Sequence, residues 1–213
     1  MNTNYKLKIY FDADDVLLQS TSTVLEILNK KYNNLNASLE DVLNWNYTDI
    51  CPWLTEKEVL DIYESPEFWD NVQINPSAIE LVKNMSRKAE LVIVSKGTKE
   101  NLRSKEIFFQ NMLPECRFIG LRFGSSGQNF SKSCVDMGGD NCLSIQIDDR
   151  TDCLNGTNAT LKILLKNGME KPWNKYCGGE PNLYVANNWD DVKAIIEFYE
   201  ANRDLLAEVA CNA

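Results

Sequence analysis

Three acidic residues stand close together directly after an apolar stretch near the start of the chain. The sequence there reads IYFDADDV over residues 9–16, so Asp12, Asp14 and Asp15 fall within four positions. Carboxylates this close repel each other and disfavour ionisation unless a cation sits among them. In an extended chain, side chains two residues apart point to the same side. We therefore expect Asp12 and Asp14 to face one site.

Two later apolar stretches also end in side chains that could do chemistry. In LVIVSKG, residues 91–97, the apolar run is followed by Ser95. In IQIDDR, residues 145–150, it is followed by Asp148 and Asp149. Neighbouring parallel strands present their carboxyl ends at one edge of a sheet, where ligands bind. Oxygen ligands with open positions suit Mg²⁺. Each acidic pair alone could be a solvated turn or helix cap, but acids at several strand ends together favour a Mg²⁺ site.

Short apolar runs alternate with helical periodicity along most of the chain. The expected strands are 6–13, 89–97, 116–124, 142–150, 161–168 and 182–187. The expected helices are 21–34, one that starts at Ser38, 55–69 with an interruption at Pro66, 75–88, 98–113 and 189–209, and a polar loop is expected at 124–133. This alternation predicts an α/β fold: a three-layer, Rossmann-like, mostly parallel sheet with helices on both faces.

The alternation stops between the first two expected strands. Residues 19–74 contain helical patterns and no clear strand. The sequence therefore predicts a small helical cap, inserted after the first strand and placed over the carboxyl-terminal edge of the sheet. The expected core domain consists of residues 1–18 and 75–213.

Composition narrows the classes of partner. The chain of 213 residues carries a formal net charge of −9 and has no cluster of Lys or Arg, so a nucleic-acid polymer is not an expected partner. A small phosphorylated ligand is compatible with this charge if a cation accompanies it. No apolar stretch approaches the roughly 20 residues of a membrane span, and no secretory signal is recognisable at the N-terminus. We expect a cytoplasmic protein without a membrane partner, and a chain of this size could form a homodimer.

The residue types also narrow the chemistry. The chain has no histidine, which excludes mechanisms with a histidine base and disfavours a zinc site. Acid–base chemistry near pH 7 must then come from carboxylates, lysine, tyrosine, thiols or metal-bound water. The seven cysteines include no C-x-x-C pair, so we expect reduced thiols.

Four passages in order resemble the motifs of the haloacid dehalogenase-like phosphatases: FDADDV, LVIVS, a downstream lysine and IQIDDR. Within that superfamily the chain is similar to the 5′(3′)-deoxyribonucleotidases of the cytosolic and mitochondrial type and to their bacterial and phage relatives. The passages that carry this closer likeness are IYESPEFWDNVQINPSAIELVKNM, SIQIDDRTD, WNK and NNWDDVKAIIEFYE. The likeness covers roughly residues 5 to 200.

The resemblance implies roles for four acids. Asp12 would be the nucleophile that attacks phosphorus and forms an aspartyl-phosphate. Asp14 would be the general acid for the leaving oxygen and then the base for water, and its backbone carbonyl would bind Mg²⁺. Asp148 would complete the metal shell, which Asp149 would support. Mg²⁺ would weaken the repulsion between Asp12 and the phosphate.

The resemblance also implies groups that bind the phosphoryl oxygens. Ser95 would donate a hydrogen bond to one of them, with help from Lys96 or nearby backbone N–H groups. Two lysines are candidates for balancing the phosphoryl charge. Lys105 aligns best with the nucleotidase group, and Lys132 lies where many other members of the superfamily have their lysine. We slightly favour Lys105 and keep both.

The sequence departs from the nucleotidase pattern at two positions. Asp15 stands where these proteins usually have a glycine, and aspartate tolerates the unusual backbone angles that such a position permits. Ser20 stands where an aromatic residue is expected. Phe68 and Trp69 remain as candidates for stacking on a nucleobase, with packing of the cap as the alternative.

These observations favour a Mg²⁺-dependent phosphatase of nucleoside monophosphates, with deoxyribonucleotides as the first expected substrates. The alternatives are a phosphatase of another small phosphate ester and a nucleotide-binding member of the same fold with weak catalysis. A phospho-accepting receiver domain is disfavoured, because such a domain has about half this length and no insertion after its first strand.

Overall fold

The computed structural model describes residues 6–123, 131–138, 142–180 and 182–202. Its centre is a six-stranded sheet in the order β3-β2-β1-β4-β5-β6, and every neighbouring pair of strands is parallel. The strands are β1 (Lys6–Phe11), β2 (Ala89–Gly97), β3 (Cys116–Arg122), β4 (Cys142–Asp148), β5 (Leu161–Leu165) and β6 (Leu183–Ala186). The predicted α/β, Rossmann-like fold is confirmed.

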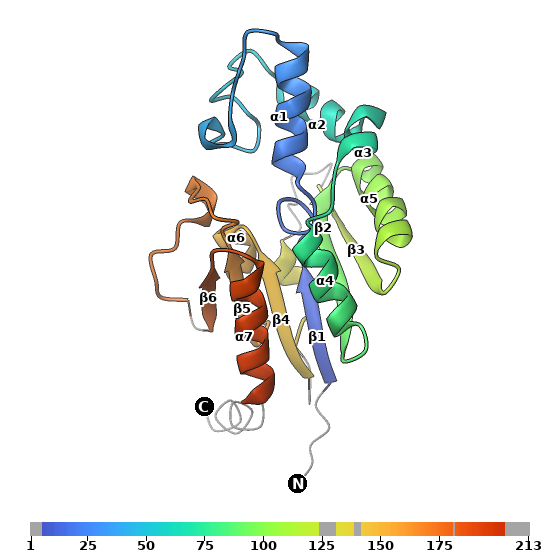
Figure 1. Cartoon of the computed structure of the whole chain (residues 1–213), viewed down its shortest axis with the longest axis vertical. Coiled ribbons are helices and arrows are strands. Elements are labelled where there is room, and N and C mark those ends of the chain that lie inside the picture. Colours follow the sequence, from blue (N-terminus) through green and yellow to red (C-terminus); the bar gives the residue numbers. More distant parts are fainter. Residues whose placement is uncertain (1–5, 124–130, 139–141, 181, 203–213) are drawn as a thin grey trace.

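Helices flank this sheet and extend beyond one of its edges (Figure 1). The α-helices are α1 (Ser20–Lys31), α2 (Glu56–Glu64), α3 (Pro66–Asn71), α4 (Pro76–Met85), α5 (Lys99–Met112), α6 (Thr151–Leu154) and α7 (Trp189–Ala201). The 3₁₀ helices are η1 (Leu39–Asp41), η2 (Lys132–Cys134) and η3 (Pro172–Asn174). Helices α4 and α7 contact each other, and α6 contacts η2 and β4.

Both faces of the sheet are buried, as the alternation of side chains along the central strands shows. Ile9 and Phe11 belong to the main hydrophobic cluster, whereas Tyr10 between them belongs to a second cluster with Val92 and Val94. Successive residues of a strand point to opposite faces. The sheet is therefore the middle layer of three.

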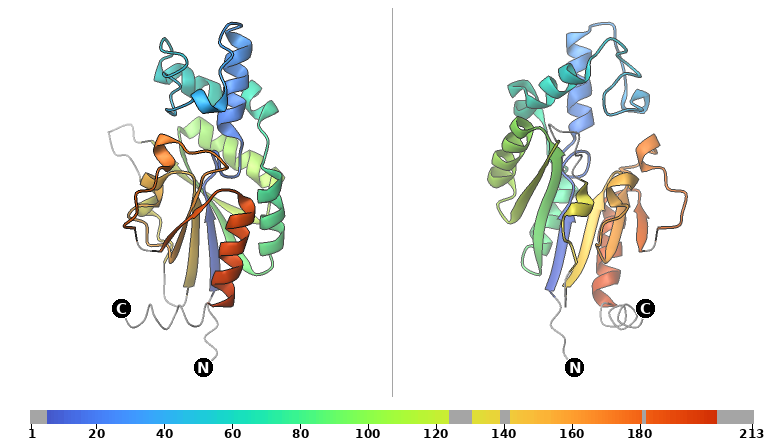
Figure 2. Two further views of the ribbon diagram at one scale, coloured as in Figure 1. Left: turned by 60° about the vertical axis from the view of Figure 1, so that its left-hand side comes forward. Right: turned by 180° about the vertical axis from the view of Figure 1, so that it is seen from behind.

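Part of the chain between β1 and β2 lies beyond the carboxyl-terminal edge of the sheet, where Figures 1 and 2 show α1, α2 and α3 above the strands. Backbone hydrogen bonds close the base of this insertion: Gln19 N donates to Gln73 O at 2.9 Å, and Asn75 N donates to Leu17 O at 2.8 Å. The division into a cap, 19–74, and a core domain stays a prediction.

Several expected helices are shorter or divided in the structure. The segment that starts at Ser38 forms only the single turn η1. Residues 55–69 form two helices, because the Ser65 hydroxyl accepts a hydrogen bond from Phe68 N at 3.1 Å and Pro66 begins α3. Helix α7 ends at Ala201. The expected continuation of the last helix beyond residue 202 and most of the polar loop 124–133 lie outside the described residues.

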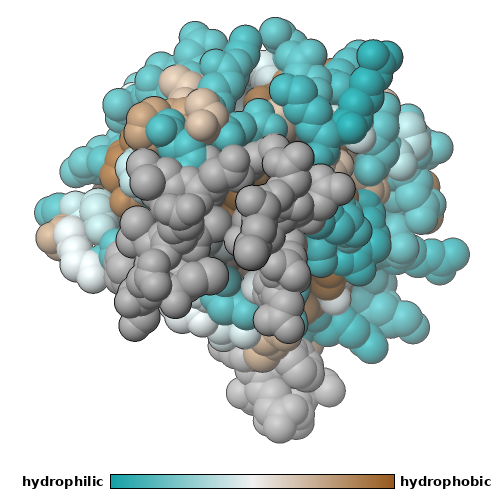
Figure 3. All heavy atoms as spheres, turned by 90° about the horizontal axis from the view of Figure 1, so that it is seen from below, coloured by the Kyte–Doolittle hydropathy of each residue, from teal (hydrophilic) through white to brown (hydrophobic). Residues whose placement is uncertain are grey.

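The surface at the amino-terminal ends of the strands is mainly hydrophilic where Figure 3 colours it, with small apolar areas between. Among the described residues, no helix combines the length and the apolar character that a membrane crossing requires. The cysteines in the described part of the chain are all free thiols: Cys51, Cys116, Cys134, Cys142, Cys153 and Cys177.

Candidate active site

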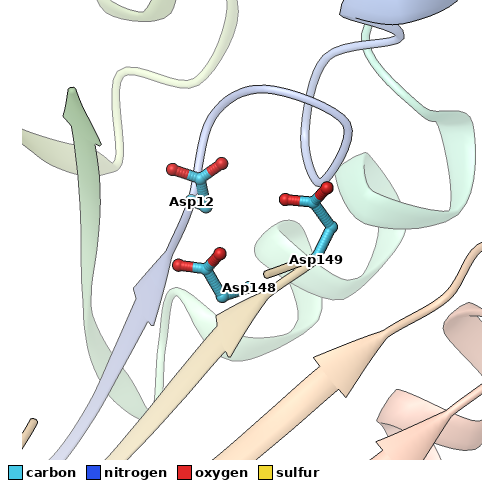
Figure 4. A group of neighbouring side chains, drawn as sticks. All are labelled: Asp12, Asp148 and Asp149. Atoms are coloured by element: carbon cyan, nitrogen blue, oxygen red, sulfur yellow. The ribbon is translucent and has the colours of Figure 1, made fainter. Parts of the chain in front are cut away.

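Three carboxyl groups meet at the carboxyl-terminal ends of the two central strands (Figure 4). Asp12 follows β1, and Asp148 and Asp149 lie at the end of β4. One carboxylate oxygen of each residue lies within 4.8 Å of the others. The register of the parallel strands causes this meeting, because Phe11 pairs with Ile147. The convergence expected from the sequence is therefore present for these acids, and all three are buried.

One buried lysine neutralises part of this charge. Lys132 Nζ forms ion pairs with Asp12 and, at 2.6 Å, with Asp148 Oδ2. Burial alone would lower the pKa of the Lys132 ammonium, but the two carboxylates outweigh it and hold the pKa above its ordinary value. Lys132 therefore stays charged at neutral pH.

The remaining negative charge is not balanced by lysine alone. Burial raises the pKa of Asp148 to about 6, against the opposing attraction of Lys132, and the charge of Asp12 adds to the rise. Burial also raises the pKa of Asp149 well above its ordinary value, with the charge of Asp15 as the next cause. Shifts in this direction mean that these carboxyl groups favour their protonated form unless a further cation lies beside them. Three clustered oxygen donors suit a hard cation such as Mg²⁺, so these residues fit the expected metal.

A second buried lysine lies on the side of β2. Lys105 on α5 is only 1% exposed. Its ammonium forms an ion pair with Asp14 and donates a hydrogen bond to Ser95 Oγ at 2.8 Å. The hydroxyl of Ser20 donates to Asp14 Oδ1 at 2.8 Å. The sequence left two lysines open, and the structure brings both to the acidic edge, each next to a different aspartate.

Asp15 adopts the backbone conformation that a glycine would favour. Its φ angle is 55°. Its carboxylate accepts hydrogen bonds from the backbone N–H of Thr21 at 2.8 Å and from the Thr21 hydroxyl. It therefore caps the first turn of α1, whose own N-cap residue, Gln19, makes no side-chain cap bond. Asn167 Nδ2 donates to the Asp15 carbonyl at 2.5 Å. Burial raises the pKa of Asp15 to about 6, and the Thr21 hydrogen bonds oppose that rise.

The aromatic candidates for base stacking lie in the insertion, within a row of packed rings. Phe68 is fully buried, with its ring centroid 5.2 Å from that of Tyr63 and 5.1 Å from that of Trp69. Trp69 is partly exposed and also packs on Phe108 at 5.6 Å. In this conformation no face of Phe68 is free for a base, whereas Trp69 keeps some exposed surface. Contact of either ring with substrate stays a prediction.

Lys96 does not direct its ammonium toward the acids of the site. The Lys96 Nζ lies over the ring of Phe123, 6.0 Å from its centroid. Its backbone carbonyl accepts a hydrogen bond from Lys105 Nζ at 3.4 Å. Lys96 therefore contacts the site through its backbone carbonyl. A role of its side chain in phosphate binding stays a prediction.

Sequence reasoning missed one residue at the acidic cluster. The indole Nε1 of Trp173 donates a hydrogen bond to Asp149 Oδ2 at 2.8 Å. In the sequence, the residues WNK contribute only to the family resemblance, which assigns Trp173 no role at the acids. A buried tryptophan N–H usually has a hydrogen-bond partner, so a partner for Trp173 could have been expected. Nothing in the sequence indicates that this partner is Asp149.

Comparisons with known proteins address the family and the fold. Residues 6–203 match the family model described as 5′ nucleotidase, deoxy (pyrimidine), cytosolic type C protein. A search of curated protein sequences found no match.

Several solved structures share the fold. A haloacid dehalogenase-like hydrolase from Streptococcus pneumoniae aligns with a TM-score of 0.59 and 18% identity, over 92% of this chain and 100% of that one. A HAD-hydrolase from Bacillus subtilis, whose structure was solved bound to magnesium, aligns with a TM-score of 0.54 and 15% identity, over 90% and 98%. A haloacid dehalogenase-like hydrolase from Xanthomonas campestris aligns with a TM-score of 0.52 and 14% identity, over 93% and 97%. At these identities the likeness extends to the fold alone.

Proposed function

Because this chain belongs to the 5′ nucleotidase, deoxy (pyrimidine), cytosolic type C family, we propose that it is a cytoplasmic, Mg²⁺-dependent phosphatase of nucleoside monophosphates that prefers deoxyribonucleotides. Its enzyme class, a phosphomonoesterase of the haloacid dehalogenase-like superfamily, follows from that membership. The metal, the preferred nucleotide and the roles of individual residues are the proposal.

The observation that carries the proposal is the meeting of Asp12, Asp148 and Asp149 beneath the insertion, with a buried lysine bound to the first two. Mg²⁺ would be held by these carboxylates and by the Asp14 carbonyl, and would weaken the repulsion between the acids and an anionic phosphate. Nucleophilic attack and proton transfer would be performed by side chains of the protein.

In the proposed reaction the Asp12 carboxylate attacks phosphorus and the ester P–O bond breaks. Asp14 gives its proton to the leaving oxygen, which departs as the nucleoside hydroxyl. Asp14 then accepts a proton from water, whose oxygen attacks phosphorus and releases phosphate and the Asp12 carboxylate. Lys105 and Ser20 contact the Asp14 carboxylate and hold it in place for both proton transfers.

The phosphoryl oxygens need positive charge and hydrogen-bond donors. Ser95 and Lys105 offer donors on the β2 side, 2.8 Å from each other. Lys132, which pairs with the proposed nucleophile, offers a second charge. Contact with Asp12 favours Lys132 as the lysine that balances the phosphoryl charge, although the resemblance favoured Lys105. Because the Lys132 ammonium is charged and buried, its attraction for the transferring phosphoryl group is stronger than it would be in water.

A second candidate, a phosphatase of another small phosphate ester, is favoured by the placement of two residues. Ser20 is buried against Asp14 where an aromatic residue was expected, and Phe68 is fully buried. Trp69 is then the one member of the predicted stacking pair with exposed surface. A third candidate, a nucleotide-binding protein with weak turnover, is supported by the extra carboxylate of Asp15, which repels an anionic substrate.

The test is phosphate release from a panel of nucleoside 5′- and 3′-monophosphates, deoxynucleotides and sugar phosphates. Each is assayed with Mg²⁺, with a chelator, and with Asp12→Asn as the matched blank. Mg²⁺-dependent release that favours deoxynucleotides supports the proposal. Release from sugar phosphates alone supports the second candidate, and binding of nucleotides without release from any substrate supports the third.

A further inference from the structure

One short segment of the core contacts both the acidic cluster and the inserted helices. Trp173 in η3 donates its indole N–H to Asp149 at 2.8 Å. Lys171, immediately before η3, donates its ammonium to two backbone carbonyls of the insertion, Leu39 O and, at 2.9 Å, Val42 O. The segment therefore joins the proposed metal site to the proposed cap.

The position of the Asp149 carboxylate depends on Trp173, whereas the other two acids of the cluster have a different partner. Asp12 and Asp148 share the ammonium of Lys132, whereas the side-chain hydrogen bond that the described residues give Asp149 comes from the indole. A buried carboxylate is costly unless a donor satisfies it. The indole therefore fixes where the Asp149 oxygens lie relative to those of Asp12 and Asp148.

The segment itself is held firmly. Asn174 Oδ1 accepts from the backbone N–H of Lys171 at 2.7 Å, and Asn174 Nδ2 donates to Met169 O at 3.0 Å. The Thr151 hydroxyl donates to the carbonyl of Trp173 at 3.0 Å, which ties η3 to the start of α6. A displacement of Lys171 is therefore transmitted to the indole, because the turn between them is internally bonded.

Lys171 favours the docked position of the insertion. Its side chain is buried, with 8% of the residue exposed, and burial lowers the pKa of its ammonium. Two of its three N–H donors are used by the carbonyls of Leu39 and Val42. If the insertion moved away, the ammonium would exchange these two carbonyls for water, and the loss of hydrogen bonds from a charged donor is unfavourable even after that exchange.

We propose that Trp173 is a positioning residue for Asp149, and that Lys171 makes this position depend on the docking of the cap. Metal affinity and cap docking are then coupled through η3. The inference rests on the proposed Mg²⁺ site but concerns two residues to which the proposed reaction assigns no step. Both residues also line a pocket of about 590 Å³ beside Asp149 and Asp15.

The experiment is a calorimetric titration of Mg²⁺ into the protein without substrate, which needs no turnover. Trp173→Phe removes the N–H and keeps an aromatic ring, and we expect Mg²⁺ to bind about 10-fold more weakly, as is typical for partners of metal ligands. The matched control is Trp189→Phe. Trp189 is buried, and its Nε1 has no hydrogen-bond partner among the described residues, so Mg²⁺ affinity should stay unchanged.

The coupling is tested with Lys171→Met, which keeps the apolar stem and removes the ammonium. We expect it to weaken Mg²⁺ binding several-fold alone and to add nothing in the Trp173→Phe background. Equal affinity of Trp173→Phe and the wild type overturns the positioning role, and additive effects of the two substitutions overturn the coupling.

Two further results separate the possible failures. A wild-type protein that does not bind Mg²⁺ refutes the metal site of the proposed function, whatever the variants do. If Trp173→Phe does not fold by circular dichroism, Thr151→Val replaces it, because this change loosens η3 and leaves the indole intact. Weaker Mg²⁺ binding by Thr151→Val supports the inference, and wild-type binding overturns it.

Discussion

Lys132 Nζ lies 2.6 Å from Asp148 Oδ2, and the same ammonium forms an ion pair with Asp12. The lysine is 3% exposed and Asp148 is fully buried. Removing the lysine would leave two buried carboxylates without this counter-charge, and an uncompensated buried charge is strongly destabilising.

Lys132→Met is therefore expected to destabilise the metal-free protein by about 3–5 kcal/mol, the range for breaking one side of a buried ion pair. Urea unfolding at pH 7 with a chelator measures this change. The control is Lys166→Met, which removes a lysine whose partner Glu170 is largely exposed, and a change below about 1 kcal/mol is expected. A stability loss for Lys132→Met no greater than that of the control would show that Lys132 does not hold the acids.

Mg²⁺ is expected to raise the melting temperature of the wild-type protein, because a ligand that binds the folded state stabilises it. Asp148→Asn keeps the shape of the side chain and removes its charge. This variant should lose most of the Mg²⁺-dependent shift and most of the turnover. A melting curve with and without Mg²⁺ gives the answer, and an Asp148→Asn variant that responds to Mg²⁺ as the wild type does contradicts the assignment of Asp148 as a metal ligand.

Asp15→Asn is expected to stabilise the metal-free protein above pH 6. The folded-state pKa of Asp15 is raised to about 6, from an ordinary value of 3.8. Between these values the folded chain keeps a proton that the unfolded chain has lost, so the wild-type contribution to stability falls as pH rises through this window. Each pKa unit corresponds to about 1.4 kcal/mol. Asparagine accepts the Thr21 hydrogen bond, tolerates positive φ and does not titrate.

The measurement for Asp15 is urea unfolding of wild type and Asp15→Asn from pH 4 to pH 8. The stability gained by the variant should grow between about pH 4 and pH 6 and then stay constant. Asp70→Asn, which makes the same change at an exposed carboxylate on α3, serves as the control. A gain for Asp15→Asn that does not change with pH would mean that burial of the Asp15 carboxylate is not its cause.

Trp69→Ala is expected to raise KM for nucleoside monophosphates more than for a small generic phosphate ester. The physical reason is base stacking, typically worth about 1–3 kcal/mol for one aromatic ring, which a ligand without a base cannot use. Trp53→Ala removes another exposed tryptophan of the insertion as a control. Equal increases of KM for both kinds of substrate would assign Trp69 to packing against Phe108.

The sheet and its acidic edge were predictable because their signals are local. Apolar β-rich runs that end in Asp12, Ser95 and Asp148 indicate strands, and parallel pairing places those ends side by side without further information. The left-handed conformation of Asp15 was also accessible, since the related proteins carry a glycine there. The fold class and the acidic cluster thus followed from short stretches of sequence.

Contacts between distant residues were not predictable in the same way. Trp173 reaches Asp149, 24 positions earlier, and Lys171 reaches Leu39, 132 positions earlier. No periodicity encodes such a pair, because it depends on how the loop after β5 folds back. Lys105 and Lys132 are also distant in sequence from the acids that they contact. The sequence therefore presented them as alternatives, although the fold brings both to the site.

The sequence also did not predict which individual side chains of the insertion are buried. Phe68 and Trp69 are adjacent and both aromatic, yet one is fully buried and the other is partly exposed. Adjacent residues of the short helix α3 point about 100° apart, so one ring can face the interior while the next reaches the surface.

In the proposed reaction, Asp12 forms a covalent bond to phosphorus. The most direct measurement is mass spectrometry of the Asp12-containing peptide after wild type and Asp12→Asn are mixed with deoxynucleotide and Mg²⁺ and quenched in acid within one turnover. We expect the added mass of a phosphoryl group on Asp12 in the wild type, with neither that mass nor phosphate release in the variant. Sustained phosphate release by a folded Asp12→Asn protein would refute the covalent intermediate.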